Sequence, residues 1–280
     1  MRITIKDIAK EAGYSTATVS RVLNKAEDPF ISDATRKKVQ ETAARLGYTA
    51  NRAAKALATG KTNMIEIQIP PFQSYNVEVS SNLHSILVAD GYDAFYLDPA
   101  ELKPGMMDQG WPVDGVISMA NPERISNYLT THKKMPLPFV SIGARYCKDI
   151  DHVGLDLYPG SVEVMEHLIS LGCKHIVYLV DSAPDYTTQP RGLAYKNTMQ
   201  SAGLQQQYVF VKDTTRKGAK NAVSELISQN NIPDAIFTHN DDKAIGACRA
   251  LKDAGIRVPK DILIAGCDGI EDTQFSIPSI

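Results

Sequence analysis

The sequence has few of the features that mark membrane, disulfide-bonded or metal-binding proteins. No stretch approaches the length of a membrane span, and the first residues contain no apolar signal segment. The four cysteines, at positions 147, 173, 248 and 267, include no Cys-x-x-Cys pair, and the six histidines show no metal-ligand spacing. We therefore expect a cytoplasmic protein that enters no membrane and holds no metal ion or cofactor.

Signatures of catalysis are also missing. The chain contains no phosphate-binding loop and no Gly-x-Ser-x-Gly motif. His239, Asp241 and Asp268 could form an acid–base cluster, but no second catalytic motif accompanies them. We expect the protein not to be an enzyme.

Positive charge is concentrated at the start of the chain. Residues 1–60 contain eleven Lys or Arg and six Asp or Glu, a net charge of +5, whereas the whole chain carries −2. Residues 61–280 therefore carry −7. A basic head on an acidic body is the expected distribution when only the head approaches nucleic acid phosphates.

The basic head has the pattern of a helix-turn-helix. A first helix over 5–12 ends at Gly13, and a second begins after Ser15, whose hydroxyl can accept from the exposed amides of a helix start. In the second helix, Val19 and Leu23 face inward. The outer face carries four side chains suited to a major groove: Thr16, Ala17, Ser20 and Arg21. Plain packing of a helical hairpin is the alternative, and the charge distribution favours DNA.

A third helix and a linker follow. The helix starts at Ser32 and ends at Gly47. The three helices are expected to enclose a core of Ile5, Ile8, Val19, Leu23, Val39 and Leu46. The alanine-rich segment 48–61 can form a helix, but so short a helix is unstable in isolation and should fold only when it docks.

The rest of the chain alternates apolar segments with helical patterns, which predicts two lobes of parallel, doubly wound sheets. The expected strands lie at 64–69, 92–97, 113–119, 138–142, 175–180, 208–211, 235–238 and 262–265. The expected helices lie at 77–89, 122–133, 159–171, after 191, at 216–229 and at 241–254. Ligands of such sheets bind beyond the carboxyl ends of the strands. The residues at those places are Phe72, Tyr75, Gly143, 181–191, Asn240, Asp241 and Asp268.

Several motifs resemble those of the LacI/GalR (lactose repressor) family of transcriptional regulators. They are TIKDIA at 4–9, STATVSRVLN at 15–24, LGY at 46–48, NRAA at 51–54, HND at 239–241 and GCD at 266–268. The resemblance covers residues 2–275 and implies an α/β fold with an all-α helix-turn-helix domain at 1–48. A hinge helix or linker at 49–61 and a periplasmic-binding-protein-like body at 62–280 complete the expected chain. The body divides into lobes at about 62–150 and 151–280.

The resemblance implies how the head meets DNA. Thr16, Ala17 and Arg21 face the bases, and a hinge helix over 51–58 forms on the operator, with Leu57 wedged into the minor groove. Arg21 can donate to guanine O6 and N7, whereas Ala17 offers only an apolar contact. Thr4, Ser15, Ser20, Asn24 and Tyr48 are expected at phosphates, and Thr18, Asn51 and Ala54 complete the predicted DNA-binding set. Packing of Leu57 against the body is the alternative.

The resemblance also places Arg191, Asn240 and Asp268 at effector-contacting positions, to which the strand ends add Tyr75 and Asp241. A guanidinium, an amide and carboxylates suit the hydroxyls of a mono- or oligosaccharide. Each residue has a structural alternative. Asp241 could cap a helix, Asn240 could hold the loop, Asp268 could close a turn with Gly269, and Arg191 could form an ion pair.

Gly143 departs from the aspartate that many family members carry there. Glycine at this position resembles regulators of maltose or α-glucoside genes and favours an oligosaccharide effector. The family also uses purines, phosphosugars and a phosphoprotein corepressor. A solute-binding protein is the alternative from another class, and the basic head argues against it.

The resemblance implies a dimeric repressor of carbohydrate-utilisation genes that binds a palindromic operator in double-stranded DNA and responds to a small sugar. Relatives continue beyond the position of Ile280. We therefore expect the C-terminal part of the body to be missing, an unpaired sheet edge in the first lobe, and weakened dimerisation and effector binding.

Overall fold

The computed structural model describes residues 3–24, 28–50, 52–70, 73–97, 113–119, 125–126, 130, 137–143, 150–182, 187 and 189–280. The chain forms two compact units, Met1–Thr62 and Asn63–Ile280.

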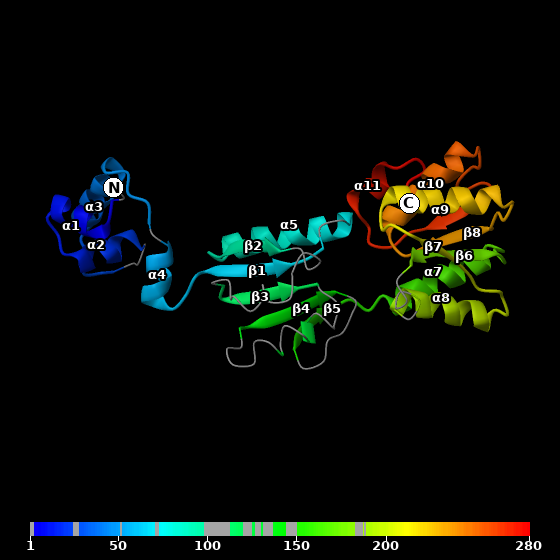
Figure 1. The fold of residues 1–280 in the computed structure, drawn as a ribbon, viewed down its shortest axis with the longest axis horizontal. Helices are drawn as coiled ribbons and strands as arrows, with labels where there is room; N and C mark the ends of the chain where they lie inside the picture. Colours follow the sequence, from blue (N-terminus) through cyan, green and yellow to red (C-terminus); the bar gives the residue numbers. More distant parts are fainter. Residues whose placement is uncertain are drawn as a thin grey trace. The chain divides into compact units, whose positions relative to one another are not determined.

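The first unit is helical, as predicted. Its helices are α1 (Ile5–Ala12), α2 (Thr16–Leu23), α3 (Asp33–Arg45) and α4 (Arg52–Thr59) (Figure 1). Gly13 ends α1 with φ +73°, a left-handed conformation that glycine adopts without strain. Ser15 caps α2 by accepting from the Thr18 amide at 3.1 Å, and Ser32 caps α3 in the same way from Thr35 at 3.3 Å.

The core of this unit contains all six predicted side chains. One detail differs, because Val22 is fully buried and Leu23 only half-buried. Residues three apart share a helix face just as residues four apart do. Val19 and Val22 can therefore face the core together in place of the predicted pair of Val19 and Leu23.

The second unit begins with a five-stranded sheet. Its elements are β1 (Met64–Gln68), α5 (Ser74–Ala89), β2 (Asp93–Leu97), β3 (Gly115–Ser118), β4 (Phe139–Gly143) and β5 (Asp151–Gly154). All strands are parallel, in the order β2-β1-β3-β4-β5. The sequence does not predict β5, whose side chains are mostly exposed. Because β5 belongs to this sheet, the first lobe extends to Gly154. The helix predicted at 122–133 lies largely outside the described residues.

A four-stranded parallel sheet of order β7-β6-β8-β9 forms the second lobe. Its elements are α7 (Tyr158–Ser170), β6 (Ile176–Asp181), α8 (Pro190–Ser201), β7 (Gln207–Val211), α9 (Arg216–Ser228), β8 (Ala235–Thr238), α10 (Asp241–Asp253), β9 (Leu263–Ala265) and α11 (Glu271–Phe275). The sequence does not predict α11.

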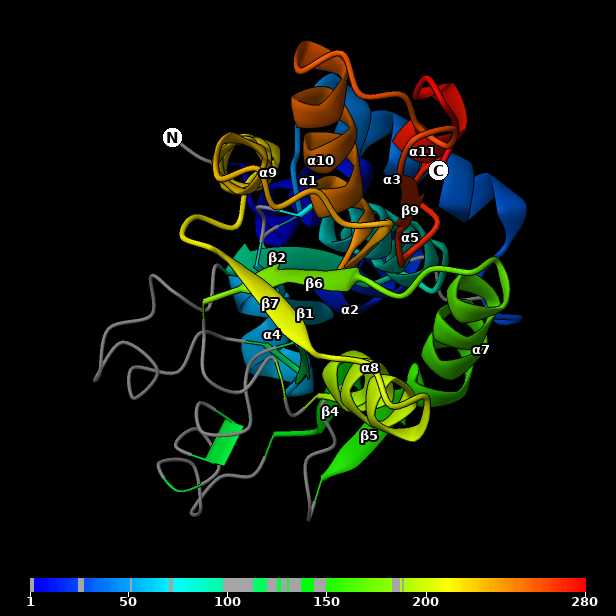
Figure 2. The ribbon, with the colours of Figure 1, turned by 90° about the vertical axis from the view of Figure 1, so that its right-hand side faces the viewer.

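Helices cover both faces of this second sheet. Tyr178 and Phe237 pack on α7 and α8, whereas Leu179 and Ile236 pack on α9 and α10 on the opposite face (Figure 2). Every residue of β6 is buried, as expected of a central strand between two helical layers. The doubly wound parallel architecture is confirmed. Among the described residues, no helix is long and apolar enough to cross a membrane.

Candidate functional site

The outer face of α2 carries the three side chains predicted to face bases. Thr16, Ala17 and Arg21 are exposed, while Val19 on the other side of the helix is completely buried. Because the buried face fixes the rotation of α2, the exposed face is held in one orientation relative to the rest of the head.

Several hydroxyls predicted at phosphates lie at helix starts. Thr4 donates its hydroxyl to the Asp7 carboxylate at 2.7 Å, and Ser15 lies 2.9 Å from the Thr18 hydroxyl. Ser20 accepts from the Asn24 side chain at 3.2 Å. The first-turn amides beside Ser15 give the start of α2 a partial positive charge that suits phosphate, whereas the Asp7 carboxylate already lies at the start of α1.

Arg21 has a partner that the sequence does not predict. Its Nη1 lies 3.1 Å from Asp28 Oδ2, and Asp28 Oδ1 accepts from the Phe30 amide at 3.0 Å. The Phe30 amide and the Arg21 guanidinium lower the pKa of Asp28. The Arg21 side chain is still 59% exposed in this ion pair.

The linker residues predicted to contact DNA differ in how exposed they are. Tyr48 is half-buried against the helical core, while Leu57 on α4 is exposed. Leu57 is 90% exposed. Ala54 lies within α4. Asn51 lies outside the described residues.

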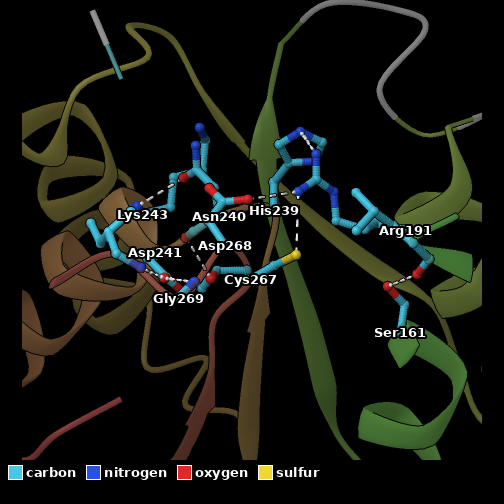
Figure 3. A network of polar contacts seen from close by, with 12 residues as sticks. Ser161, Arg191, His239, Asn240, Asp241, Lys243, Cys267, Asp268 and Gly269 are labelled. Atoms are coloured by element: carbon cyan, nitrogen blue, oxygen red, sulfur yellow. Dashed lines mark hydrogen bonds and ion pairs between the residues drawn. The ribbon is translucent and has the colours of Figure 1, made fainter. Parts of the chain in front are cut away.

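The second unit gathers polar side chains at the carboxyl ends of β6, β8 and β9 (Figure 3). Arg191, in the first turn of α8, is buried and donates through Nη1 to Asp268 Oδ1 and to Cys267 Sγ, each at 3.4 Å. Its Nη2 lies 2.9 Å from His239 Nε2. The ion pair weighed as an alternative for Arg191 is therefore present, and it joins two of the predicted effector residues.

His239 continues this chain of contacts. Its Nδ1 lies 2.8 Å from the hydroxyl of Tyr178, which is buried in the sheet. Arginine only donates hydrogen bonds, so the Nε2 that faces Arg191 must accept. The His239 ring is therefore neutral, with its proton on Nδ1. The sequence draws attention to His239 through the HND motif and through the acid–base cluster considered with Asp241 and Asp268, whereas nothing in it indicates Tyr178.

Asp268 is the most perturbed carboxyl of this group. Burial raises its pKa to about 7, although the Arg191 guanidinium opposes the shift. Its backbone has φ +124°, a region that side-chain-bearing residues seldom adopt. A carboxyl that is half ionised near neutral pH can both donate and accept hydrogen bonds, which suits ligand hydroxyls.

Asn240 and Asp241 have different structural roles. Asn240 caps α10 by accepting from the Lys243 amide at 3.1 Å. Asp241 is the first residue of α10 and accepts from the amides of Gly269 and Ile270 at 2.6 and 3.0 Å. The helix cap considered for Asp241 is thus supplied by Asn240, and Asp241 holds the loop after Asp268.

Beneath these residues lies a buried ion pair. Lys243 Nζ and Asp181 Oδ1 are 2.8 Å apart, with side-chain exposures of 0% and 4%. Apart from this ion pair, neither charged group has a hydrogen-bond partner among the described residues. The pair ties the end of β6 to the start of α10, the two elements on either side of the site.

Tyr75 approaches this group from the first lobe. Burial raises the pKa of Tyr75, the Asp268 carboxylate adds to the shift, and Arg191 opposes it. The residue before it, Ser74, donates its amide to Asp242 of the second lobe at 3.0 Å, which brings this end of the first lobe to the start of α10. Phe72, residues 183–186 and residue 188 lie outside the described residues.

Gly143 ends β4 with φ +115°, where a side chain would strain the backbone. An aspartate could adopt this conformation only with strain, as Asp268 does at φ +124°. Among the described residues, no group of His, Cys, Asp and Glu side chains could hold a metal ion.

Comparisons with known proteins agree with both parts of the chain. A family model described as bacterial regulatory proteins, lacI family, matches residues 4–51, and one described as a periplasmic binding protein-like domain matches residues 165–280. Catabolite control protein A of Priestia megaterium is 30% identical over 292 residues, which cover 100% of this chain and 86% of that relative. The chain belongs to the LacI family.

Other relatives support this assignment. The HTH-type transcriptional repressor PurR of Glaesserella parasuis is 29% identical, with 99% of this chain and 83% of that protein covered. The lac repressor dimer bound to operator and the anti-inducer ONPF shares the fold with a TM-score of 0.83, at 22% identity, covering 100% of this chain and 86% of that one. This LacI-family protein is a DNA-binding transcriptional repressor and not an enzyme.

Proposed function

We propose that the protein represses carbohydrate-utilisation genes by binding a palindromic operator as a dimer and that a neutral sugar in the second unit controls this binding. The observation that carries the DNA-binding half is the exposed Thr16, Ala17 and Arg21 face of α2 on a head of net charge +5. Base contacts by this face supply sequence discrimination, and the surrounding basic charge supplies salt-dependent affinity.

α4 is proposed as the hinge helix that meets the minor groove. Leu57 is apolar and almost fully exposed, and a leucine wedge between base pairs gains burial in return for unstacking them. The lac repressor of the same fold binds its operator as a dimer, which supports the same assembly here. Two heads on one palindrome also compensate for the weak binding of a single head.

The effector is proposed to lie among Tyr75, Arg191, Asn240 and Asp268, with Asp241 supporting the loop that carries Asp268. Arg191 already donates to Cys267, Asp268 and His239, so few of its donors remain for a phosphate. Hydroxyls that both donate and accept match the site better. A sugar is further supported by the transcriptional regulator CelR, which has the same fold and forms a complex with cellobiose.

An oligosaccharide of the maltose type is the finer proposal, and a purine is the second candidate, because several similar repressors are named PurR. Selection of binding sites from a random duplex library tests the repressor function, and a palindromic consensus is expected. Calorimetric titration with maltose, cellobiose, ribose, hypoxanthine and guanine then tests the effector. Binding of a purine and of no sugar would contradict the carbohydrate proposal while leaving operator binding intact.

A further inference from the structure

Asp242 links the two lobes of the second unit. This residue, in the first turn of α10, accepts from the backbone amide of Ser74 through Oδ2 at 3.0 Å and from the Ser74 hydroxyl through Oδ1 at 2.9 Å. Ser74 is the first residue of α5 in the other lobe, 168 positions away in the sequence. A carboxylate from the second lobe therefore caps a first-lobe helix at its positive end.

Arg216 completes the contact from α9. Its Nε donates to Asp242 Oδ1 at 2.6 Å, and its Nη2 donates to the Ser74 hydroxyl at 3.0 Å. Burial alone would raise the pKa of Asp242, but the amide and hydroxyl of Ser74 and the Arg216 guanidinium bring it below its ordinary value. The carboxylate is 9% exposed, so separating the lobes would remove two of its three partners.

A second contact lies one helical turn further along α5. The Glu271 amide, at the start of α11, donates to Glu78 Oε1 at 3.3 Å. Ser74 and Glu78 are four residues apart and share a face of α5. The same face of α5 therefore meets the second lobe at two points.

Both residues of the Ser74–Asp242 contact are sequence neighbours of predicted effector residues. Ser74 precedes Tyr75, and Asp242 follows Asn240 and Asp241. We propose that Asp242 is a positioning residue that latches α5 onto the second lobe and so holds Tyr75 near Arg191 and Asp268. An effector that contacts both lobes then binds more tightly to the latched arrangement, because it does not have to bring the lobes together.

The inference rests on the proposed effector site, but its test needs neither effector nor DNA. Cysteines are introduced by Glu78→Cys and Glu271→Cys at the second contact, and a short bismaleimide reports how often the lobes approach there. Mass spectrometry of the 78–271 peptide pair measures the yield. The reporter is combined with Asp242→Asn or Ser74→Ala, and with Asp253→Asn as the matched control. Asp253 lies at the other end of α10, and both of its ion-pair partners, Lys220 and Arg249, belong to the second lobe.

Asp242→Asn keeps the size of the side chain but removes the charge, and Ser74→Ala removes one hydroxyl from a helix start, so at least one variant should fold. The latch predicts that both variants lower the crosslink yield roughly tenfold, as the loss of a charge-assisted hydrogen bond implies, whereas Asp253→Asn leaves it unchanged. Yields that stay at the control level in both variants would overturn the latch and leave the proposed repressor function untouched.

Discussion

Arg191 and His239 form a hydrogen bond of 2.9 Å in which the arginine must be the donor and the histidine ring must be neutral. The same guanidinium also reaches Cys267 and Asp268, so one planar group fixes three side chains at the strand ends. Lysine has the charge but lacks the planar array of donors that makes this possible.

We therefore predict that Arg191→Lys weakens binding of whichever sugar the wild-type chain takes by roughly 10- to 100-fold, the loss expected for one or two charge-assisted hydrogen bonds. Operator affinity without sugar should not change. Calorimetry measures the first quantity and fluorescence anisotropy the second. Sugar affinity equal to that of the wild type would remove Arg191 from the proposed site.

Asp268 predicts a pH dependence of stability with a definite sign. Its pKa is about 7 in the folded protein, above the ordinary value of 3.8. Between about pH 4 and pH 7 the unfolded chain ionises this carboxyl while the folded chain keeps it protonated, so the contribution of Asp268 to the free energy of unfolding falls as pH rises and levels off above pH 7.

Asp268→Asn removes this titration. Melting temperatures measured from pH 4.5 to 8 should therefore fall less steeply with rising pH in Asp268→Asn than in the wild type. The matched control Asp253→Asn should retain the wild-type slope because its carboxyl pKa is lowered and titrates below this range. Parallel curves for the wild type and Asp268→Asn would contradict the raised pKa.

The buried Lys243–Asp181 pair predicts non-additive mutations. Lys243→Met leaves the Asp181 carboxylate buried without a counter-ion and should lower the free energy of unfolding by about 3–5 kcal/mol. Adding Asp181→Leu removes the stranded charge and should restore much of that loss. Urea unfolding of the two single variants and the double variant gives the coupling. A double variant whose loss equals the sum of the single losses would show that the pair does not act as a unit.

Leu57 on α4 predicts an effect on DNA shape. Leu57→Ala should reduce operator bending, because alanine is too small to hold two base pairs apart, while the stability of the head should stay unchanged since Leu57 is exposed. Energy transfer between dyes at the two ends of an operator duplex measures the bend. Lys55→Ala, an exposed neighbour on α4, is the control for loss of affinity alone, and an unchanged angle in Leu57→Ala would exclude the wedge.

The sequence predicted most of the fold because local signals specify it. Gly13, Ser15 and Ser32 mark helix ends through caps that involve neighbours within a few residues, and the helices of the head begin and end within two residues of their predicted bounds. β5 lacks such a signal, since its exposed side chains have no apolar pattern.

The start of α5 shows a different limit. The pattern predicts a helix from 77, but α5 begins at Ser74, whose amide is satisfied by Asp242 from the other lobe. A cap supplied from 168 residues away cannot be found in a local pattern. The candidate effector site also depends on residues that are distant in the sequence. Arg191 and Asp268 could be named from the family resemblance. The contact of Arg191 with His239, and the capping of α10 by Asn240 instead of Asp241, depend on how the strand ends meet.

Discrimination between DNA sequences by α2 of the basic head is the property on which the repressor function depends, and the binding of Arg21→Ala tests it most directly. Fluorescence anisotropy should compare the selected operator with a scrambled duplex at fixed salt, for the wild type and for this variant. We expect the wild type to prefer the operator and Arg21→Ala to lose about 1–3 kcal/mol of this preference at each half-site while binding the scrambled duplex almost as before. Equal preference in the two proteins, or no preference in the wild type, would contradict sequence reading by α2.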